Sequence, residues 1–217
     1  MFYRRKEVNM MRNISKISLI VLFVITALTF GARGGNAATL DLLGVGWGKS
    51  DITVLIKPAG AVTPEAVQDV EAAVSDWASA LQAVTGTPTL TLVQGVKSAD
   101  IVIHMKVGGG AVLGHTLPKT ISPFSCALKS VFIQLSGKAF GQNFSDTGTG
   151  NVARHEFGHA LGLGHSDDPN DLMYGAAESS EIFGNTEVPI SNCDKEGIDA
   201  IYPLPQFCDI PDSISCP

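Results

Sequence analysis

Residues 155–165 read His-Glu-Phe-Gly-His-Ala-Leu-Gly-Leu-Gly-His, and this stretch decides how the rest of the chain is interpreted. His155 and His159 stand four residues apart, so on a helix their imidazoles project from one face, one turn apart. Two imidazoles at that separation can bind one zinc ion, and Glu156 between them is placed to act on a metal-bound water. The stretch therefore predicts a zinc-binding helix.

The residues after this helix predict a third metal ligand. Glycine accepts the left-handed conformation in which helices often stop, so Gly162 is expected to end the helix. The chain can then turn and bring His165 to the same metal. Three histidines and a water form the open tetrahedral arrangement of a catalytic zinc rather than a structural one. A bare HExxH also occurs in unrelated helices that merely expose these side chains, but the hinge and the third histidine make the longer motif specific.

Together with the residues that follow it, the motif resembles the metzincin clan of zinc endopeptidases, and within that clan the matrixins. As in matrixins, Ser166 follows the third histidine, an Asp-Pro pair comes soon after, and Leu172 and Met173 complete the sequence. The resemblance implies that Met173 forms the turn beneath the metal, whereas filling of the core is the alternative explanation for a methionine there. It also implies that Glu156 is the catalytic residue.

The N-terminal half of the chain predicts strands around one long helix. Thr63 and Pro64 are expected to begin the helix, in which apolar residues recur at steps of three and four. Runs rich in β-branched residues are expected to form strands at residues 51–57, 89–93, 99–107 and 130–135. This order indicates an α+β (mixed α/β) domain in which helices cover a twisted sheet.

The matrixin resemblance covers residues 47–203 and adds detail to this fold. It implies a metzincin catalytic domain with a twisted mixed sheet, an edge strand along the cleft, a long backing helix, a zinc helix and a C-terminal helix. Ser191 begins a sequence typical of a capping box, which would start that last helix. Residues 137–150 and 176–189 are expected to be loops, and the second would form a wall of the substrate pocket. Gly175, before that wall, stands where matrixins usually have a proline.

A substrate-binding edge is expected at residues 111–118, which resemble the matrixin strand beside the active-site cleft. Unpaired backbone groups on such an edge can bind an extended protein or peptide substrate as an added strand. The residues expected to make these contacts are Val112, Leu113, Gly114, His115 and Thr116. His115 also stands where the family has one ligand of a second zinc, but its other ligands have no counterpart here. A solvated or hydrogen-bonded His115 is therefore favoured.

The first residues are expected to be a secretory signal peptide, residues 1–38. Basic residues precede an uncharged apolar run at residues 17–30, and small residues follow at Gly35, Asn36, Ala37 and Ala38. The apolar run is shorter than the roughly 20 residues that a membrane-spanning helix needs. The prediction is thus a secreted protein without stable membrane insertion; anchoring through an uncleaved leader is the alternative. A catalytic domain at residues 39–204 and a cysteine-containing tail at residues 205–217 would follow.

Charge excludes some partners. The chain has 15 basic and 21 acidic residues, and removal of the leader leaves 9 and 20, a net charge of −11. Such an acidic surface argues against nucleic acid or an anionic membrane as a partner.

Calcium is considered as a second cofactor beside one catalytic zinc, held by Asp146 and nearby carbonyls. One acid is few for an ion that takes about six to eight oxygen ligands.

Cysteine usage agrees with export. Cys126, Cys193, Cys208 and Cys216 all lie outside the leader, and an even count in an exported protein predicts two disulfides with three alternative pairings. We expect Cys126 to take one of the tail cysteines, which would join the tail to the domain.

Two functions follow from these observations. The preferred one is a secreted zinc-dependent endopeptidase, in which a zinc-activated water attacks the peptide bond and Glu156 is the general base. The alternative is a secreted peptide-binding module that retains an inactive metalloprotease fold. Matrixins commonly carry a propeptide whose cysteine blocks the zinc, and no such motif lies between Ala38 and Asp51.

Overall fold

The computed structural model describes residues 37–203 and 207–216. The predicted signal peptide falls outside this part of the chain, apart from its last two residues. Within the described ranges, no helix combines the length and the apolar composition that crossing a membrane would require.

The main sheet is mixed, with mostly parallel strands in the order β2-β7-β5-β3-β4 and with β6 antiparallel to β7. Its strands are β2 (Gly46–Trp47), β3 (Asp51–Pro58), β4 (Thr89–Leu92), β5 (Ile101–Met105), β6 (Gly114–Ile121) and β7 (Ala127–Leu135). The four strands expected between residues 51 and 135 are all present, with ends that differ by a few residues. The α+β (mixed α/β) class is therefore confirmed.

The long helix is α2 (Pro64–Val84), and its start is the one the sequence predicts. The Thr63 side chain accepts a hydrogen bond from the Ala66 backbone N–H at 3.2 Å, which satisfies a donor that has no partner inside the helix. The predicted apolar stripe is buried along the middle of the helix at Val70, Val74, Trp77 and Leu81. This stripe packs the helix into the core.

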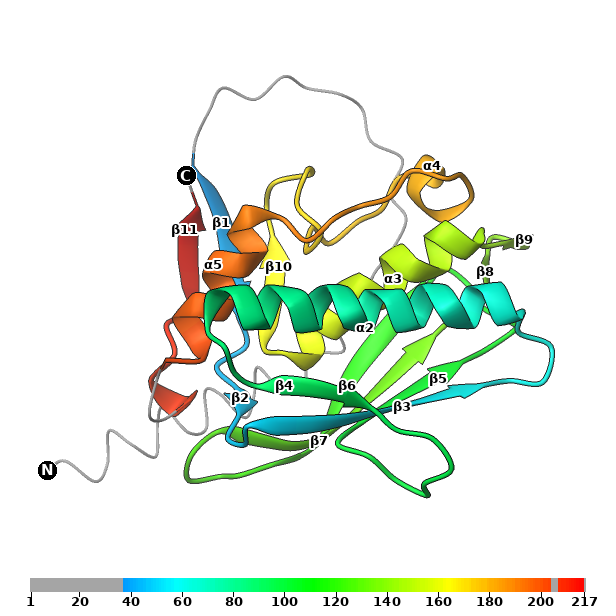
Figure 1. The fold of residues 1–217 in the computed structure, drawn as a ribbon. Coiled ribbons are helices and arrows are strands. Elements are labelled where there is room, and N and C mark those ends of the chain that lie inside the picture. Colours follow the sequence, from blue (N-terminus) through cyan, green and yellow to red (C-terminus); the bar gives the residue numbers. More distant parts are fainter. Residues whose placement is uncertain (1–36, 204–206, 217) are drawn as a thin grey trace, which may run out of the picture.

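The helix of the zinc motif, α3 (Asp146–Ala160), packs against α2 and against strands β6 and β7. Both helices lie on the same face of the main sheet, and no described helix lies on the opposite face (Figure 1). β6 is hydrogen-bonded to β7 along one edge only within the described residues. The strand expected to bind substrate is thus an edge strand beside α3.

A second, three-stranded sheet was not anticipated. It has the order β10-β1-β11 and consists of β1 (Ala38–Leu42), β10 (Leu163–Ser166) and β11 (Ser213–Cys216). All pairings are antiparallel, and Leu40 lies opposite Ser166 on one side and Ile214 on the other. The short β1 thereby connects the strand of the zinc motif to the end of the chain (Figure 1).

Two disulfides join the tail to the rest of the fold. Cys126 is bonded to Cys208, and Cys193 to Cys216. The expectation of two disulfides, with Cys126 bonded to a tail cysteine, is confirmed. A 3-10 helix that contains Cys208, η1 (Phe207–Asp209), places the Phe207 ring where a side chain at Gly46 would stand. The predicted boundary between a domain and a tail, at residues 204 and 205, stays a prediction.

The two predicted loops contain regular structure. Residues 137–150 hold a short hairpin, β8 (Lys138–Ala139) with β9 (Gln142–Asn143), and the first turn of α3. The prediction of a loop there is wrong, because the Ser145 side chain accepts from the Gly148 N–H and starts the helix earlier than expected. Residues 176–189 contain a single short helix, α4 (Ser179–Ile182). The capping box at Ser191 is confirmed and begins α5 (Asn192–Ile201).

Candidate metal centre

Three histidines from two elements converge on one point. His155 and His159 project from α3, and His165 comes from β10 after the turn. Each offers one ring nitrogen, and these atoms lie within 4.8 Å of one another. The ring centroids are 4.7 to 5.4 Å apart. Among the described residues, this is the one group of three or more potential ligands close enough to share an ion.

The turn between the two elements depends on glycine. Gly162 has φ of +107°, in the region that side chains rarely adopt. A Cβ atom there would also stand 2.3 Å from the Val45 carbonyl oxygen. Both reasons exclude larger residues, so the turn that carries His165 back to the helix requires Gly162.

Backbone carbonyls orient two of the imidazoles. Nδ1 of His155 lies 2.7 Å from the Leu172 carbonyl oxygen, and Nδ1 of His159 lies 2.9 Å from that of Leu163. A carbonyl oxygen only accepts, so each Nδ1 carries the proton and donates. In the neutral ring, Nε2 then holds the lone pair that a metal requires.

Burial keeps these rings neutral. His155 and His159 are 1% and 2% exposed. Burial, followed by the neighbouring His165, lowers the pKa of His155 to about 3, because a charged imidazole loses its hydration there. Burial also lowers the pKa of His159 well below its usual value, with the other two histidines contributing, and lowers that of His165. A metal could therefore bind without displacing protons from the rings.

Glu156 is fully buried on the side of α3 that faces β6. The Thr116 hydroxyl lies 2.6 Å from Glu156 Oε2 and 2.8 Å from the Glu156 carbonyl oxygen. A Cβ at Gly114 would lie 2.7 Å from Oε1, so the carboxylate occupies the space that glycine leaves. Burial raises the pKa of Glu156 to about 8. The edge strand thus contacts the carboxylate through Gly114 and Thr116.

Met173 is completely buried against α3. A Cβ at Gly158, next to His159, would stand 2.4 Å from the Met173 sulfur, so the thioether lies directly under the helix. The Ser166 N–H donates to the Met173 carbonyl at 2.8 Å, and its hydroxyl donates to Asp171 Oδ2 at 2.6 Å. The segment from His165 to Met173 is therefore closed on itself below the three histidines.

A family model for matrixin matches residues 129–203, the part of the chain that holds all three histidines, Glu156 and Met173. The chain carries a matrixin-like catalytic domain. The interstitial collagenase of Bos taurus is 48% identical over 60 residues, and the neutrophil collagenase of Homo sapiens is 51% identical over 53. Matrilysin of Homo sapiens is 38% identical over 69 residues.

The three alignments are partial on both sides. They cover 28%, 24% and 30% of this chain, and 12%, 11% and 22% of the bovine collagenase, the neutrophil collagenase and matrilysin. The chain therefore spans less than a quarter of the length of each of these relatives.

Two tryptophans outside the matched residues hold the helix of the matrixin-like domain. The Trp77 indole N–H donates to the Arg154 carbonyl, and the Trp47 indole N–H donates to the Ala160 carbonyl, both at 2.8 Å. These carbonyls flank the turn that bears the two helical histidines. No role at the site was predicted for either tryptophan.

Two polar residues in the middle of α3 were missed. The buried Arg154 guanidinium forms ion pairs with Asp76 of α2, at 2.6 Å, and with Glu187. The Asn151 amide donates to the carbonyls of Glu181 and Thr186 at 2.9 and 2.8 Å. Both side chains fix the segment that follows α4 onto α3. No short motif indicates such contacts, because their partners are distant in the sequence.

That segment closes a small pocket of about 20 Å³ beside His155 in the matrixin-like domain. Its lining includes Asn151, Leu172, Ala177 and Val188. The expectation that residues 176–189 form a wall of the substrate pocket stays a prediction.

The residues expected to bind substrate divide between two faces of β6. Gly114 and Thr116 face Glu156, as described above, whereas His115 faces away, with Nδ1 3.5 Å from the Gln134 side-chain nitrogen. Val112 and Leu113 precede the strand, and Leu113 is fully buried.

Asp146, the residue considered for calcium, is the first residue of α3. Its Oδ1 lies 3.5 Å from the hydroxyl of Thr63, the residue that caps α2.

Proposed function

We propose that the protein is an exported zinc-dependent endopeptidase. The observation that carries this proposal is the convergence of three neutral imidazoles, with ligand atoms within 4.8 Å of one another, beside the buried carboxylate of Glu156. Three nitrogen ligands with a fourth position left for water are the donor set of catalytic zinc. The family match supports the same reaction class.

The residues fit the metal. In the described part of the chain, the buried Nε2 atoms of His159 and His165 have no hydrogen-bond partner, and neither does Oε1 of Glu156. Buried polar atoms are normally satisfied, so their common orientation indicates a shared ligand. His155, His159 and His165 would hold zinc, which supplies Lewis acidity to water and to the scissile carbonyl.

Glu156 would handle the proton. The Thr116 hydroxyl donates to Oε2 and fixes the plane of the carboxylate, which leaves Oε1 as the atom that accepts the proton of the attacking water. Glu156 would then return this proton to the leaving amine. General acid–base help of this kind is worth roughly 10²–10⁴ in rate.

The substrate would be an extended peptide. β6 has one free edge among the described strands, and it lies directly beside Glu156. A peptide added to this edge would form backbone hydrogen bonds with alternate residues, Val112, Gly114 and Thr116, because Leu113 and His115 direct their backbone groups to β7. Export is supported by the two disulfides, which persist in oxidising compartments.

The deciding experiment replaces Glu156 with Gln, which keeps the size of the side chain and removes the base. Zinc content, by elemental analysis, should stay near one per chain, while cleavage of a mixed peptide library should fall at least a hundredfold. Wild-type protein treated with a chelator and then reloaded with zinc is the control. Loss of zinc in Glu156→Gln would show that the ligands are misassigned. A zinc-loaded wild-type protein that cleaves nothing would leave a binding module as the function.

A further inference from the structure

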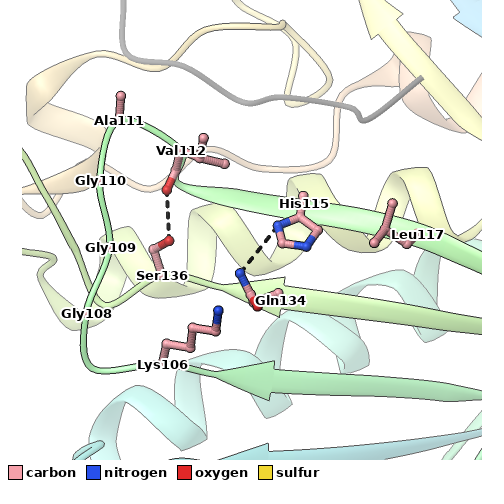
Figure 2. A pocket seen from close by; sticks show the side chains of 10 residues that line it. All are labelled: Lys106, Gly108, Gly109, Gly110, Ala111, Val112, His115, Leu117, Gln134 and Ser136. Atoms are coloured by element: carbon pink, nitrogen blue, oxygen red, sulfur yellow. Dashed lines mark hydrogen bonds between the residues drawn. The ribbon is translucent and has the colours of Figure 1, made fainter. Parts of the chain in front are cut away.

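A second pocket lies on the outer face of the main sheet, opposite the helices. Its volume is about 600 Å³, and its lining includes Lys106, His115, Leu117 and Gln134 and the loop at residues 108–112. Side chains alternate along β6: Gly114 and Thr116 face Glu156, so His115 and Leu117 face the other way. Figure 2 shows His115 and Gln134 pointing toward each other above Lys106. The pocket is thus separate from the metal centre.

The strand register arranges polar donors in one row across this face. Lys57 of β3 lies opposite His104 of β5, His104 opposite Gln134 of β7, and Gln134 opposite His115 of β6. Lys106 follows His104 by two residues and therefore emerges on the same face. The row brings two ammonium groups, two imidazoles and an amide together.

An apolar row runs beside the donors. Val102 lies opposite Phe132, and Phe132 opposite Leu117. Lys119 extends over the Phe132 ring, with its ammonium 5.0 Å from the ring centroid. Of this row, Leu117 lines the pocket. The pocket therefore offers apolar contact next to the charge of Lys106, which suits a short carbon chain that ends in an anion.

The loop that closes the pocket is held in place by close contacts. The Ser136 hydroxyl donates to the Val112 carbonyl at 2.8 Å (Figure 2). A Cβ at Gly109 would stand 2.1 Å from the Lys138 carbonyl oxygen, so only glycine permits this approach. Gly108 and Gly110 have open space around them, which leaves their backbone accessible from the pocket.

No acid balances this charge. The pocket lining contains neither Asp nor Glu, and no ion pair of Lys106 is found among the described residues. Burial lowers the pKa of His115, and the charges of Lys106 and Lys119 lower it further. The pKa of His104 is lowered by burial and by the charges of Lys57 and Lys106. These lysines are three of only nine basic residues outside the predicted leader. Their collection on one face of an acidic chain calls for an anionic ligand.

We propose that this pocket is a carboxylate-binding site, distinct from the metal centre. Lys106 supplies the charge that pairs with one carboxylate group, the Gln134 amide supplies a neutral donor, and Leu117 contacts the methylene groups next to the carboxylate. The carboxylate can come from an acidic side chain of a polypeptide or from a free organic acid, and the two sources are separable by experiment.

The test follows binding by NMR in the full chain with Glu156→Gln, so that no peptide is hydrolysed. The probes are succinate, a set of decapeptides with one Glu at successive positions, and the same set with Gln. We expect saturable shifts of the Gln134 side-chain amide and of the Gly108 and Gly110 backbone amides. Glu peptides should bind about threefold to tenfold more tightly than their Gln partners, with the difference shrinking at high salt.

Matched lysine variants decide the outcome. Lys106→Gln should abolish the preference for Glu, Lys106→Arg should retain it, and Lys195→Gln on α5 should leave it unchanged. Tighter binding of Glu peptides than of succinate identifies a polypeptide source, and the reverse identifies a free acid. Equal binding of Glu and Gln peptides together with no succinate binding would overturn the proposal, as would an unaltered preference in Lys106→Gln. Wild-type cleavage is scored separately, so the proposed protease function can stand or fail independently.

Discussion

The residues that match the matrixin model and the residues before them are related to the site in different ways. Residues 129–203 match the matrixin model and contain every proposed ligand, the general base and Met173. The residues before them lie outside the match, yet Trp47, Trp77 and Thr116 donate hydrogen bonds to the helix that carries the ligands. The comparison teaches that a motif specifies the chemistry, while positioning of that chemistry depends on a sheet and a helix with far less sequence signal.

The largest effect should come from a substitution within the matched residues, 129–203. His155→Ala removes one of three nitrogen ligands, and its zinc affinity should fall by more than about a hundredfold, since loss of a mere supporting partner can cost that much. Peptide cleavage should vanish with the metal. Circular dichroism should still report the native sheet, because β3, β5 and β7 do not contact the metal. Full zinc occupancy in this variant would contradict the ligand assignment.

Removal of the disulfides should have the next largest effect. One joins the tail to Cys126, before the matched residues, and the other joins it to Cys193, within them. Cys126–Cys208 closes a separation of 82 residues, and Cys193–Cys216 closes one of 23. Loop-closure entropy predicts losses of about 4.5 and about 3.4 kcal/mol in the free energy of unfolding when each pair is changed to serine. Denaturant titration of both double variants measures the difference. A larger loss for the shorter loop would contradict an entropic origin.

The contributions of Asp194 and Asp100 to the free energy of unfolding should change with pH in opposite directions. Burial raises the pKa of Asp194 to about 6 from 3.8. The native state then holds this proton more tightly than the unfolded chain. Its contribution is therefore complete below about pH 4 and is lost as the pH rises to about 6, a change of about 2–3 kcal/mol. Asp194→Asn keeps the oxygen that accepts from Ser191 and should remove this loss.

Asp100, which lies before the matched residues, should show the opposite pH dependence. Burial acts to raise its pKa, but hydrogen bonds from Lys49 and Thr53 outweigh burial and lower it. Its contribution should therefore be present above its unfolded pKa and disappear as the pH falls through the folded value. Urea unfolding between pH 3 and pH 7, for wild type and both Asn variants, checks the two signs. Parallel pH curves for wild type and Asp194→Asn would refute the assignment.

The smallest effect should come from Thr116→Val, a change on β6, which lies before the matched residues. Valine keeps the shape and suits a strand, but it cannot donate to Glu156 Oε2. We expect kcat to fall about threefold to tenfold, in line with the roughly 0.5–1.5 kcal/mol of an ordinary hydrogen bond, with zinc content and KM nearly unchanged. Thr116→Ser retains the hydroxyl and should stay close to wild type. A change in KM alone would assign Thr116 to substrate binding instead.

Much of this molecule was predictable, because its strongest signals are local. Helix spacing placed His155 and His159 on one face, Gly162 announced the turn, and the Thr63 cap located α2. The second sheet was not predictable, since β1 and β11 are short and their pairing joins distant segments such as Ala38 and Cys216.

The side chains around Glu156 were also hidden from sequence analysis. Alternation along β6 puts Gly114 and Thr116 on one face and His115 on the other, but it does not say which face meets α3. Resemblance pointed to the backbone of this strand and gave no hint of a hydroxyl on the general base. Arg154 was missed for a similar reason, because its partners Asp76 and Glu187 are far away in the chain.

The place of β1 has a consequence for the order in which the molecule can be assembled. During synthesis β1 emerges first, but both of its neighbours, β10 and β11, emerge much later. Strand pairs of such large sequence separation close slowly, because the entropy of the intervening chain is lost before any contact compensates for it. We therefore expect a nascent chain to form the α2-covered sheet early. The strand that carries His165 would pair with β1 only after that sheet has formed, so a competent metal centre should appear late in folding.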